Sequence, residues 1–582
     1  MPQLIRRRAP VTEQLSASGI NPVLARIFAS RGIGDAFELS LGLDQLLPPA
    51  GFAGLDAAAV LLADSLEAGE SILIVGDFDA DGATSTAVAM TLLRAMGAVA
   101  VDYLVPNRFE YGYGLTPEIV ELAEQRSPGL IVTVDNGISS LDGVQRAREL
   151  GIKTLITDHH LPGRTLPGAD VIVNPNQPGC YFPSKSLAGV GVIFYVMSGL
   201  RSELRRRGWF EQQGLAEPAL GEVLDLVALG TVADVVPLDR NNRILVQQGL
   251  LRMRAGRTRP GLRALLEIAS RPLQRVVASD LSFAVGPRLN AAGRLDDMSV
   301  GIACLLAEDE HSARQLAERL DAFNRDRQSI EKSMQAEAKG LIDQLLRDVS
   351  DDKVPTTPNS ICLYEPGWHQ GVVGILASRI KDRLHRPAIA FADGDGGGIK
   401  GSARSIPGLH IRDVLDRVAT CNPGLVSKFG GHAMAAGLSL RADDFERFRQ
   451  AFDAEVSLWL DDVELQSIVE SDGELGGADL DLLLARELRY AAPWGQHFPE
   501  PVFDGEFDLV HQRIVGERHL KLVLSHPDNP AEMLDAIAFN VDLEQWPDPA
   551  IEKVRLAYRL DCNYFRGQER LQLMVEVLEA LS

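Results

Sequence analysis

The sequence predicts a multidomain α/β protein with a parallel sheet, a long connecting helix, a second α/β block and a C-terminal β-barrel. In the first half of the chain, apolar runs rich in β-branched residues alternate with helical patterns, which is typical of a parallel sheet covered on both faces. Apolar residues then recur at helical spacing over residues 301–348. Strand-like alternation broken by turns follows in residues 465–582, and this pattern indicates a small barrel.

The elements of the first sheet are the most strongly indicated. The chain of 582 residues is long enough for several domains, and a mostly helical segment of residues 1–45 comes first. Apolar runs then predict four strands: Ile72–Val75, Leu130–Val134, Leu155–Thr157 and Val171–Val173. Val223–Val232 is a further apolar run, and we expect it to be a strand as well. A helix is expected over Ala83–Met96. Residues 46–300 are therefore expected to form one parallel-sheet domain.

The remaining boundaries follow from changes in pattern. The long helix is expected over residues 301–349, and residues 350–359 are linker-like because they are rich in Ser, Asp, Pro and Thr. A second α/β domain is expected over residues 355–460. Residues 503–524 and 553–577 carry the strand-like alternation of the last domain, residues 465–582.

Composition narrows the class of protein. The net charge of −22 argues against a protein that coats nucleic acid through overall positive charge, although it permits a local basic groove. The five cysteines are scattered and form no Cys-x-x-Cys, which suits a reducing compartment. Arg6-Arg7-Arg8 precedes no apolar run, and no apolar stretch reaches membrane-span length. We expect a soluble, cytoplasmic protein with no membrane association.

Clusters of acidic and imidazole side chains follow the apolar runs. They are Asp77-Phe-Asp79-Ala-Asp81-Gly82, Asp135-Asn-Gly, Asp158-His-His and Asp234. An unpaired buried carboxylate costs several kcal/mol, so such clusters usually hold a metal ion. Ligands of an open parallel sheet bind beyond the carboxyl ends of its strands, and all four clusters are expected to converge at that edge.

The donor set favours a hard divalent cation. Asp77-x-Asp79-x-Asp81-Gly82 matches the start of a calcium-binding EF-hand loop, but its twelfth position is Val88 and a strand precedes it. An oxygen-rich set with imidazole and no thiolate suits Mn²⁺ or Mg²⁺. Several shared carboxylates suggest two metals about 3.5–4 Å apart, which activate water for phosphodiester hydrolysis.

At this point the chain resembles a known family. Val75 to Thr86, the Asp135-Asn-Gly motif and Asp158-His-His are similar to the DHH phosphoesterase superfamily. Further motifs resemble the bacterial RecJ single-strand-specific 5′→3′ DNA exonucleases: Pro106-Asn-Arg108, Asn174-Pro-Asn-Gln-Pro178, Gly286-Pro-Arg-Leu-Asn-Ala-Ala-Gly-Arg294 and Gly430-Gly-His432. The resemblance covers essentially the whole chain. It implies a DHH domain, a connecting helix, a DHH-associated substrate domain and a C-terminal OB-fold.

The resemblance also implies roles for the acidic clusters. Asp79 and Asp135 would hold one metal, and a second would be held by Asp81, Asp135, His159 and Asp234. His160 would orient the scissile phosphate or assist proton transfer. Many relatives carry a histidine ligand where this chain has Val75, so Asp77 is expected to compensate, directly or through water.

Recognition of a strand end requires anion-binding groups. Arginine forks suit a terminal phosphate, which singles out Arg108, Arg288 and Arg294, with Asn290 nearby. Gly401-Ser402-Ala-Arg404-Ser matches the phosphate-contacting loop of the DHH-associated domain, and His432 is expected to contact substrate. OB-folds bind single strands by aromatic stacking beside basic residues, for which Tyr564 and Arg566 are candidates.

The resulting hypothesis is a metal-dependent exonuclease that degrades single-stranded DNA from its 5′ end and releases mononucleotides in recombination and repair. Two alternatives remain open: a phosphodiesterase for short oligonucleotides or cyclic dinucleotides, and a non-catalytic scaffold at repair sites. The resemblance implies single-stranded DNA-binding protein as a partner and a RecQ-type helicase that exposes the substrate. We expect the chain to act as a monomer.

Overall fold

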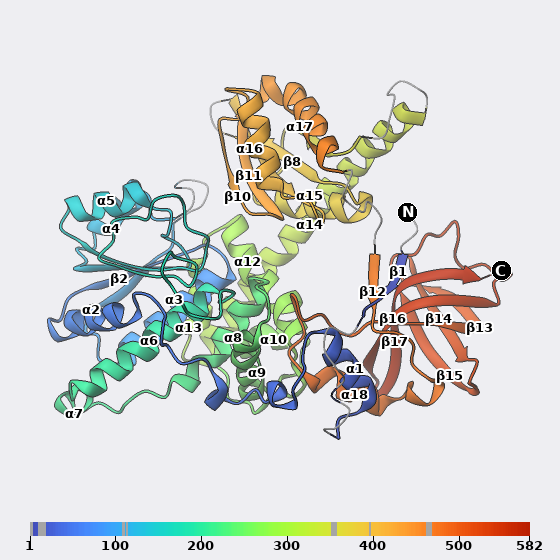
Figure 1. The fold of residues 1–582 in the computed structure, drawn as a ribbon, viewed down its shortest axis with the longest axis horizontal. Coiled ribbons are helices and arrows are strands. Elements are labelled where there is room, and N and C mark those ends of the chain that lie inside the picture. Colours follow the sequence, from blue (N-terminus) through green and yellow to red (C-terminus); the bar gives the residue numbers. More distant parts are fainter. Residues whose placement is uncertain are drawn as a thin grey trace. The chain divides into compact units, whose positions relative to one another are not determined.

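The chain folds into two compact units, which a computed structural model describes for residues 4–9, 15, 19–106, 111, 114–350, 358–394, 397–460 and 468–581 (Figure 1). The larger unit comprises residues 7–324 and 470–582, and the smaller one residues 325–469 with the first six residues. Within the described residues, no helix has both the length and the hydropathy that crossing a membrane requires.

A parallel sheet organises the first part of the larger unit, as predicted. Its strand order is β3-β2-β4-β5-β6, and every neighbouring pair is parallel. The strands are β2 (Ile72–Gly76), β3 (Val101–Leu104), β4 (Leu130–Val134), β5 (Lys153–Thr157) and β6 (Val171–Val173). Strands β2 and β4 are buried along their whole length, which explains their uninterrupted apolar sequences. Strand β3, at the edge, was not anticipated from the sequence.

Helices cover both faces of this sheet (Figure 1). One core combines Ile74 and Val132 with α2 (Leu55–Glu67), α3 (Ala80–Ala95) and α6 (Gly189–Arg206). The opposite core combines Leu73, Val75 and Ile131 with α4 (Pro117–Glu124) and α5 (Leu141–Glu149). This two-sided burial leaves the carboxyl ends of the strands as the place where polar side chains gather.

The apolar run expected as a further strand is instead a helix. Residues of α8 (Leu224–Ala233) are buried around the whole helix, from Leu224 to Val232. A helix that is apolar on every side lies inside a domain, and an apolar run of this length does not distinguish such a helix from a buried strand. Asp234 therefore follows a helix rather than a strand.

Further short elements complete the helical part of the larger unit. The α-helices are α7 (Trp209–Gln213), α9 (Arg240–Arg254), α10 (Pro260–Ile268), α11 (Ala278–Asp280), α12 (Gly286–Leu295) and α13 (Ser299–Leu306). Between α11 and α12 lies a π-helical turn, η5 (Leu281–Val285), and 3₁₀ turns occur at η1 (Ala36–Leu39), η2 (Leu43–Gln45), η3 (Leu220–Val223) and η4 (Leu273–Arg275).

The long helix is α14 (Glu310–Ser350), so residues 301–306 belong to α13 and not to the connecting helix. Most of the expected linker, residues 351–357, lies outside the described residues.

The smaller unit contains the second α/β domain. Its sheet order is β10-β11-β9-β8-β7, in which β7 and β8 are parallel and the other pairs antiparallel. The elements are β7 (Ile361–Tyr364), α15 (Val373–Leu384), β8 (Ala388–Asp393), β9 (Gly398–Arg404), α16 (Ile411–Cys421), β10 (Lys428–Gly431), β11 (Ala435–Arg441), η7 (Ala442–Asp444) and α17 (Phe445–Trp459). Helix α15 packs on one face of β8, while α16 and α17 pack on the other.

The C-terminal part of the larger unit is a closed barrel, as predicted. Its strands are β13 (Phe503–Val515), β14 (His519–His526), β15 (Asn529–Ala538), β16 (Lys553–Phe565) and β17 (Gln568–Leu581), in the order β13-β14-β15-β17-β16. Before the barrel come β12 (Ile468–Ser471), η9 (Gly477–Asp479) and α18 (Leu482–Ala491). The N-terminal segment contains α1 (Pro22–Ser30) but also a strand, β1 (Leu4–Arg7), which pairs with β12. Ile27 of α1 joins the barrel core.

Candidate metal centre

Acidic and imidazole side chains converge at the carboxyl edge of the parallel sheet. Asp77, Asp79 and Asp81 follow β2, Asp135 follows β4, and His159 follows β5. Strands β2, β4 and β5 are adjacent, so their ends bring these residues together. Asp234 joins the same group from the C-terminal end of α8. The prediction of convergence is supported, although the fourth cluster arrives from a helix.

The start of helix α3 fixes two of the carboxylates. The Asp79 side chain caps the helix, because its Oδ1 accepts hydrogen bonds from the amides of Asp81 at 2.9 Å and Gly82 at 3.0 Å. Asp81 is 1% exposed, and its carboxylate accepts hydrogen bonds from the amides of Gly189 at 2.6 Å and Val190 at 2.9 Å. These amides begin α6, whose N-terminal dipole favours an anion. Sequence reasoning missed both amides.

Asp135 occupies a turn after β4. Its φ of 62° lies in the left-handed region, which aspartate adopts more readily than most residues other than glycine. The side chain of Asn136 donates to the carbonyls of Val75 at 3.1 Å and Val134 at 2.9 Å, and so ties the ends of β2 and β4 together. A Cβ on Gly189 would lie 2.7 Å from the Asp135 side chain, so only glycine fits there. Val75 points into the core with α4 and α5, and Asp77 and Asp79 lie with Asp135 instead.

His159 lies at the middle of the acidic group. Its Nε2 is 3.1 Å from Asp135 Oδ1, 3.4 Å from Asp234 Oδ2 and 4.0 Å from Asp81 Oδ2. Candidate ligand atoms lie within 4.8 Å of one another in three sets: Asp77, Asp79 and Asp135; Asp81, His159 and Asp234; and Asp135, His159 and His160. Asp135 and His159 each belong to two of these sets, so the three sets overlap.

Asp158 has a positioning role and is not in any of these sets. Its Oδ1 accepts from the amide of His159 at 2.7 Å and contacts His160 Nδ1 at 2.7 Å, while its Oδ2 accepts from the amide of Ile138 at 2.9 Å. The side chains of Asn174 and Asn176 donate to the carbonyls of His160 at 2.9 Å and His159 at 2.6 Å. The Asn174-Pro-Asn176 motif therefore holds the loop that presents both imidazoles.

The buried charges perturb one another. Burial is the main cause that raises the pKa of Asp81 to about 7, and the charge of Asp234 adds to it. Burial likewise raises the pKa of Asp234 to about 8, with a further contribution from the charge of Asp79. Burial and the neighbouring charge of Asp81 also raise the pKa of Asp135 well above its usual value. Burial lowers the pKa of His159, so its imidazole is neutral and can act as a ligand.

His160 behaves differently from its neighbour. Burial alone would lower its pKa, but the hydrogen bond and charge of Asp158 outweigh burial and raise the pKa to about 9. Burial would likewise raise the pKa of Asp158, but the hydrogen bond from His160 lowers it. The adjacent imidazoles are thus one neutral ring and one protonated ring, which suits a ligand beside a proton donor.

A divalent cation fits this constellation. His159 Nε2 is buried and has no hydrogen-bond partner within the described part of the chain. Buried carboxylates held side by side without a cation nearby are unfavourable, and a divalent ion would remove that repulsion. Oxygen donors with one or two imidazoles suit Mn²⁺ or Mg²⁺, because neither ion requires thiolate.

The arginines expected in the first domain have mixed surroundings. Arg108 lies outside the described residues. Arg288 pairs with Asp321 at 2.9 Å and donates to the carbonyl of Ala284 at 2.6 Å, so its guanidinium is engaged within the protein. Asn290 Oδ1 accepts from the amide of Ala80 at 2.7 Å and thereby holds the start of α3. Arg294 is half-buried in the last turn of α12.

The smaller unit contains a half-buried cationic group around Arg404. Its Nη1 donates to Ser402 Oγ at 2.9 Å and to the carbonyl of Ala403 at 2.8 Å. A Cβ on Gly374, in the first turn of α15, would lie 2.8 Å from Arg404 Nη2, so glycine lets the guanidinium approach that helix end. Burial lowers the pKa of Arg404, and no acidic side chain among the described residues forms an ion pair with it. An anion would compensate this charge. His432 is exposed in the turn between β10 and β11.

The barrel presents its candidate residues at one hairpin. Tyr564 is 41% exposed near the end of β16, and the guanidinium of Arg275 lies 3.3 Å from its ring centroid. Arg566 is exposed in the turn that follows, with a φ of 52°. An exposed tyrosine beside arginines is a suitable platform for a nucleobase.

Comparison with family models accounts for most of the chain. A model described as "DHH family, N-terminal domain" matches residues 71–231. "DHHA1 domain" matches residues 358–458, and "RecJ OB domain" matches residues 471–577. These matches contain the parallel sheet, the second α/β domain and the barrel, in that order.

Whole proteins and solved structures match as well. The chain is 56% identical over 574 residues to the single-stranded-DNA-specific exonuclease RecJ of Escherichia coli, covering 99% of this chain and 98% of the relative. The crystal structure of RecJ from Thermus thermophilus in complex with Mn²⁺ has 29% identity and a TM-score of 0.80, covering 99% of this chain and 80% of that one. The corresponding Mg²⁺ complex has 28% identity and a TM-score of 0.73, covering 99% and 79%.

Proposed function

The chain belongs to the RecJ family, and from this premise we propose that it is a metal-dependent exonuclease that hydrolyses single-stranded DNA from the 5′ end. The observation that carries the chemistry is the convergence of Asp81, Asp135 and Asp234 on Nε2 of His159. The family-model matches and the similarity to RecJ structures with Mn²⁺ and Mg²⁺ support either ion as cofactor.

The proposed ligands form two sets. Asp79 and Asp135, supported by Asp77, would hold one ion, and Asp81, Asp135, His159 and Asp234 would hold the other. When bound, such a pair activates water and stabilises the attacking and leaving oxygens of a phosphodiester. The α6 amides fix the Asp81 carboxylate, and the neutral His159 offers a nitrogen lone pair.

His160 is proposed to act on the substrate rather than on the metal. Its pKa of about 9 keeps the imidazole protonated near neutral pH. Asp158 fixes the ring through the 2.7 Å contact to Nδ1. A protonated imidazole beside the carboxylates can donate to a phosphate oxygen and attract the scissile phosphate to an otherwise acidic site.

The preference for a 5′ end is proposed to come from Arg404 and Ser402. Their half-buried, cationic surroundings suit a terminal phosphate, which carries more charge than an internal one. His432 is proposed to contact the same substrate, and Arg108 and Arg294 are proposed to contact its backbone. Arg288 and Asn290 are proposed to position α12 and α3 instead, because each is engaged within the protein.

The barrel is proposed to guide the strand through Tyr564 and Arg566. The barrel and the acidic group each disfavour one of the two alternatives. An enzyme for short oligonucleotides or cyclic dinucleotides has no need of a strand-binding domain, and a non-catalytic scaffold has no need of the complete acidic group.

We infer the cellular setting from the same features. A single-strand-specific enzyme needs exposed substrate, so we propose single-stranded DNA-binding protein and a RecQ-type helicase as partners in recombination and repair. All the proposed ligands come from one chain, so the chemistry needs no second copy, and a monomer is proposed. Five free cysteines support a reducing, cytoplasmic location.

Digestion of end-labelled DNA tests the function. Single-stranded DNA labelled at the 5′ or 3′ end would be incubated with Mn²⁺, Mg²⁺ or a chelator, beside a duplex of the same sequence. We expect immediate release of 5′ label as mononucleotide, slow loss of 3′ label, and no product with chelator or blunt duplex. Early release of 3′ label would contradict the polarity, and metal-independent cleavage would contradict the proposed chemistry.

A further inference from the structure

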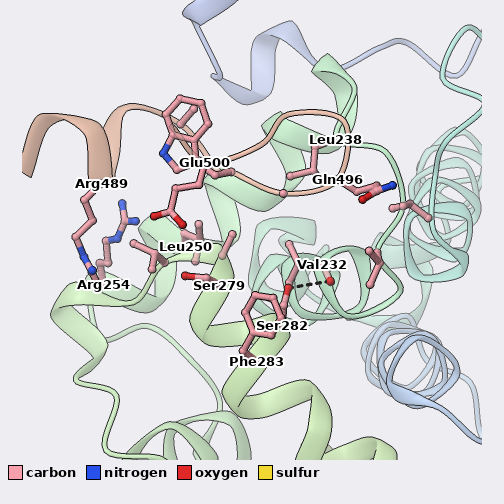
Figure 2. Close-up of a pocket in the computed structure, with 17 residues that line it drawn as sticks. Val232, Leu238, Leu250, Arg254, Ser279, Ser282, Phe283, Arg489, Gln496 and Glu500 are labelled. Atoms are coloured by element: carbon pink, nitrogen blue, oxygen red, sulfur yellow. Dashed lines mark hydrogen bonds between the residues drawn. The ribbon is translucent and has the colours of Figure 1, made fainter. Parts of the chain in front are cut away.

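A cavity of about 340 Å³ lies within the larger unit, between the end of α8 and the segment that leads to the barrel (Figure 2). Its volume falls within the range of about 300–1,000 Å³ that is usual for ligand sites. One wall is close in sequence to a proposed metal ligand, because Val232, Val235 and Val236 lie within two residues of Asp234. The opposite wall comes from the segment between α18 and β13, with Trp494 and Glu500.

The apolar part of the cavity contains two unusually exposed side chains. Phe283 is 82% exposed and Val235 is 60% exposed, although both lie close in sequence or space to buried helices. Phe283 belongs to the π-helical turn η5, and Ser282 Oγ donates to the carbonyl of Val232 at 2.9 Å, which ties this turn to α8 (Figure 2). Val235 has a φ of 60°, which is strained for a β-branched residue. Such turns and strained residues occur frequently at functional sites.

The other end of the cavity is lined by two arginines. Arg254 and Arg489 lie together at one side of it (Figure 2). Arg254 Nε donates to the carbonyl of Val276 at 2.9 Å, and in the described part of the chain no carboxylate forms an ion pair with this guanidinium. Arg489 pairs with Asp561 at 3.1 Å and with Asp280 at 4.0 Å, and its Nη2 donates to the carbonyl of Arg275 at 3.5 Å. Its buried Nε has no hydrogen-bond partner among the described residues. Glu500, the acidic side chain of the wall, is paired with Arg559 at 2.5 Å.

Arginine–tyrosine contacts continue from the cavity to the barrel. The Arg254 guanidinium lies 4.8 Å from the ring centroid of Tyr490, and the Arg275 guanidinium lies 3.3 Å from that of Tyr564. Tyr490 is 36% exposed and Tyr564 is 41% exposed. Aromatic rings beside guanidinium groups bind single strands through base stacking and phosphate contacts.

We propose that this cavity binds one nucleotide unit of the DNA strand as it passes from the barrel to the metal centre. The base would pack against Phe283 and Val235, and the adjoining phosphate would contact Arg254 and Arg489. This inference rests on the proposed exonuclease function and adds a nucleotide site to it. A peptide that ends in a carboxylate could also match an apolar cavity with arginines. The position between a metal ligand and the barrel favours DNA.

Abasic scanning tests the base contact. Full-length enzyme would digest 5′-phosphorylated single strands that each carry one abasic residue, placed at successive distances from the 5′ end. We expect the wild-type enzyme to slow about tenfold when the abasic residue occupies the cavity. The Phe283→Ala variant should digest all strands more slowly, and its rate should no longer depend on the position of the abasic residue. The matched control is Phe37→Ala, which removes an exposed phenylalanine away from the cavity.

Scanning with neutral methylphosphonate linkages tests the phosphate contact in the same way. We expect the wild-type enzyme to slow when one neutral linkage lies near the position at which an abasic residue slows it. The Arg254→Gln variant should have a higher KM and should not slow at that linkage. Unchanged scanning profiles in both variants, or binding of a peptide with a free C-terminal phenylalanine that does not compete with DNA, would overturn the site. If the wild-type enzyme degrades no single strands with either metal, the proposed function fails instead of this inference.

Discussion

The metal centre and the Arg404 site are two places where charge of one sign gathers without an equal counter-charge from the protein. At the metal centre, burial and mutual repulsion raise the pKa of Asp81 and Asp234. At Arg404, burial lowers the pKa of a guanidinium. The pair of Arg31 and Asp472 contrasts with both, because these side chains are 2% and 0% exposed and lie 2.7 Å apart. Buried charge that the protein itself neutralises is structural, whereas buried charge of one sign predicts a ligand of the opposite sign.

Removing one carboxylate from the metal centre should have the largest effect. We expect Asp135→Asn to lower the hydrolysis rate by about 10³-fold or more, because both proposed ion sites lose a shared ligand and several kcal/mol of stabilisation. Initial rates on single-stranded DNA with Mn²⁺ measure this loss. The thermal unfolding midpoint of the metal-free variant should not fall, since the substitution relieves repulsion.

A matched control for this variant is available on the same domain. Asp142 is exposed in the first turn of α5, and Asp142→Asn should keep wild-type activity. Retained activity in Asp135→Asn would show that the buried acidic group is structural, and the comparison with Arg31 and Asp472 would then lose its basis.

Metal and pH should act together on stability. In the metal-free protein, the raised pKa of Asp81, about 7, and of Asp234, about 8, means that folding favours their protonated forms. Their contribution to stability is therefore complete below the unfolded-state pKa, near 4, and is lost as pH rises toward 8. A divalent ion binds the ionised forms, so added Mn²⁺ should raise the unfolding midpoint more at pH 8 than at pH 6.

Thermal unfolding with Mn²⁺ and with a chelator at both pH values measures this difference. An exposed carboxylate pair would give no such pH dependence. Equal stabilisation at pH 6 and pH 8 would contradict the view that the ion replaces protons on these residues.

Much of the metal centre could be predicted from the sequence because its ligands follow short, strongly apolar strands. Residues after β2, β4 and β5 must meet at one edge of a parallel sheet, and this rule brought Asp81, Asp135 and His159 together. Asp234 lies at the same site but follows a helix, α8, instead of a strand. The sequence before it is rich in Leu, Val and Ala on every side of a helix, which a periodicity argument does not separate from a strand.

Other parts of the sites leave no local signal in the sequence. The amides of Gly189 and Val190 hold Asp81, but backbone donors have no residue-type signature. The cavity combines Arg254, Phe283 and Arg489 from separate helices, so their proximity depends on tertiary packing. By contrast, Ser402 and Arg404 are two residues apart on one strand, and the motif alone indicated that they act together.

The Arg404 site should give a smaller effect than the metal centre. Charge-assisted hydrogen bonds contribute about 1.5–3 kcal/mol, so Arg404→Gln should weaken use of 5′-phosphorylated strands about 10–100-fold, mainly through KM. Strands with a 5′-hydroxyl should be affected less, because they lack the terminal charge. Steady-state rates on both substrates measure the difference. Arg412→Gln, at an exposed position of α16, is the control. Equal losses on both substrates would indicate a structural role.

The barrel should contribute least to any single step, because stacking on one ring is one contact among several. Tyr564→Ala removes the ring that lies 3.3 Å from the Arg275 guanidinium, and we expect affinity for a long single strand to fall about threefold to tenfold. Tyr564→Phe keeps the ring and should bind like the wild-type enzyme. Binding to labelled DNA in chelator separates affinity from hydrolysis. Equal weakening in both variants would assign the effect to the hydroxyl and its contact with Glu569. In that case Tyr564 would make a structural contact, as the Arg31–Asp472 pair does, and would not be a ligand-binding residue.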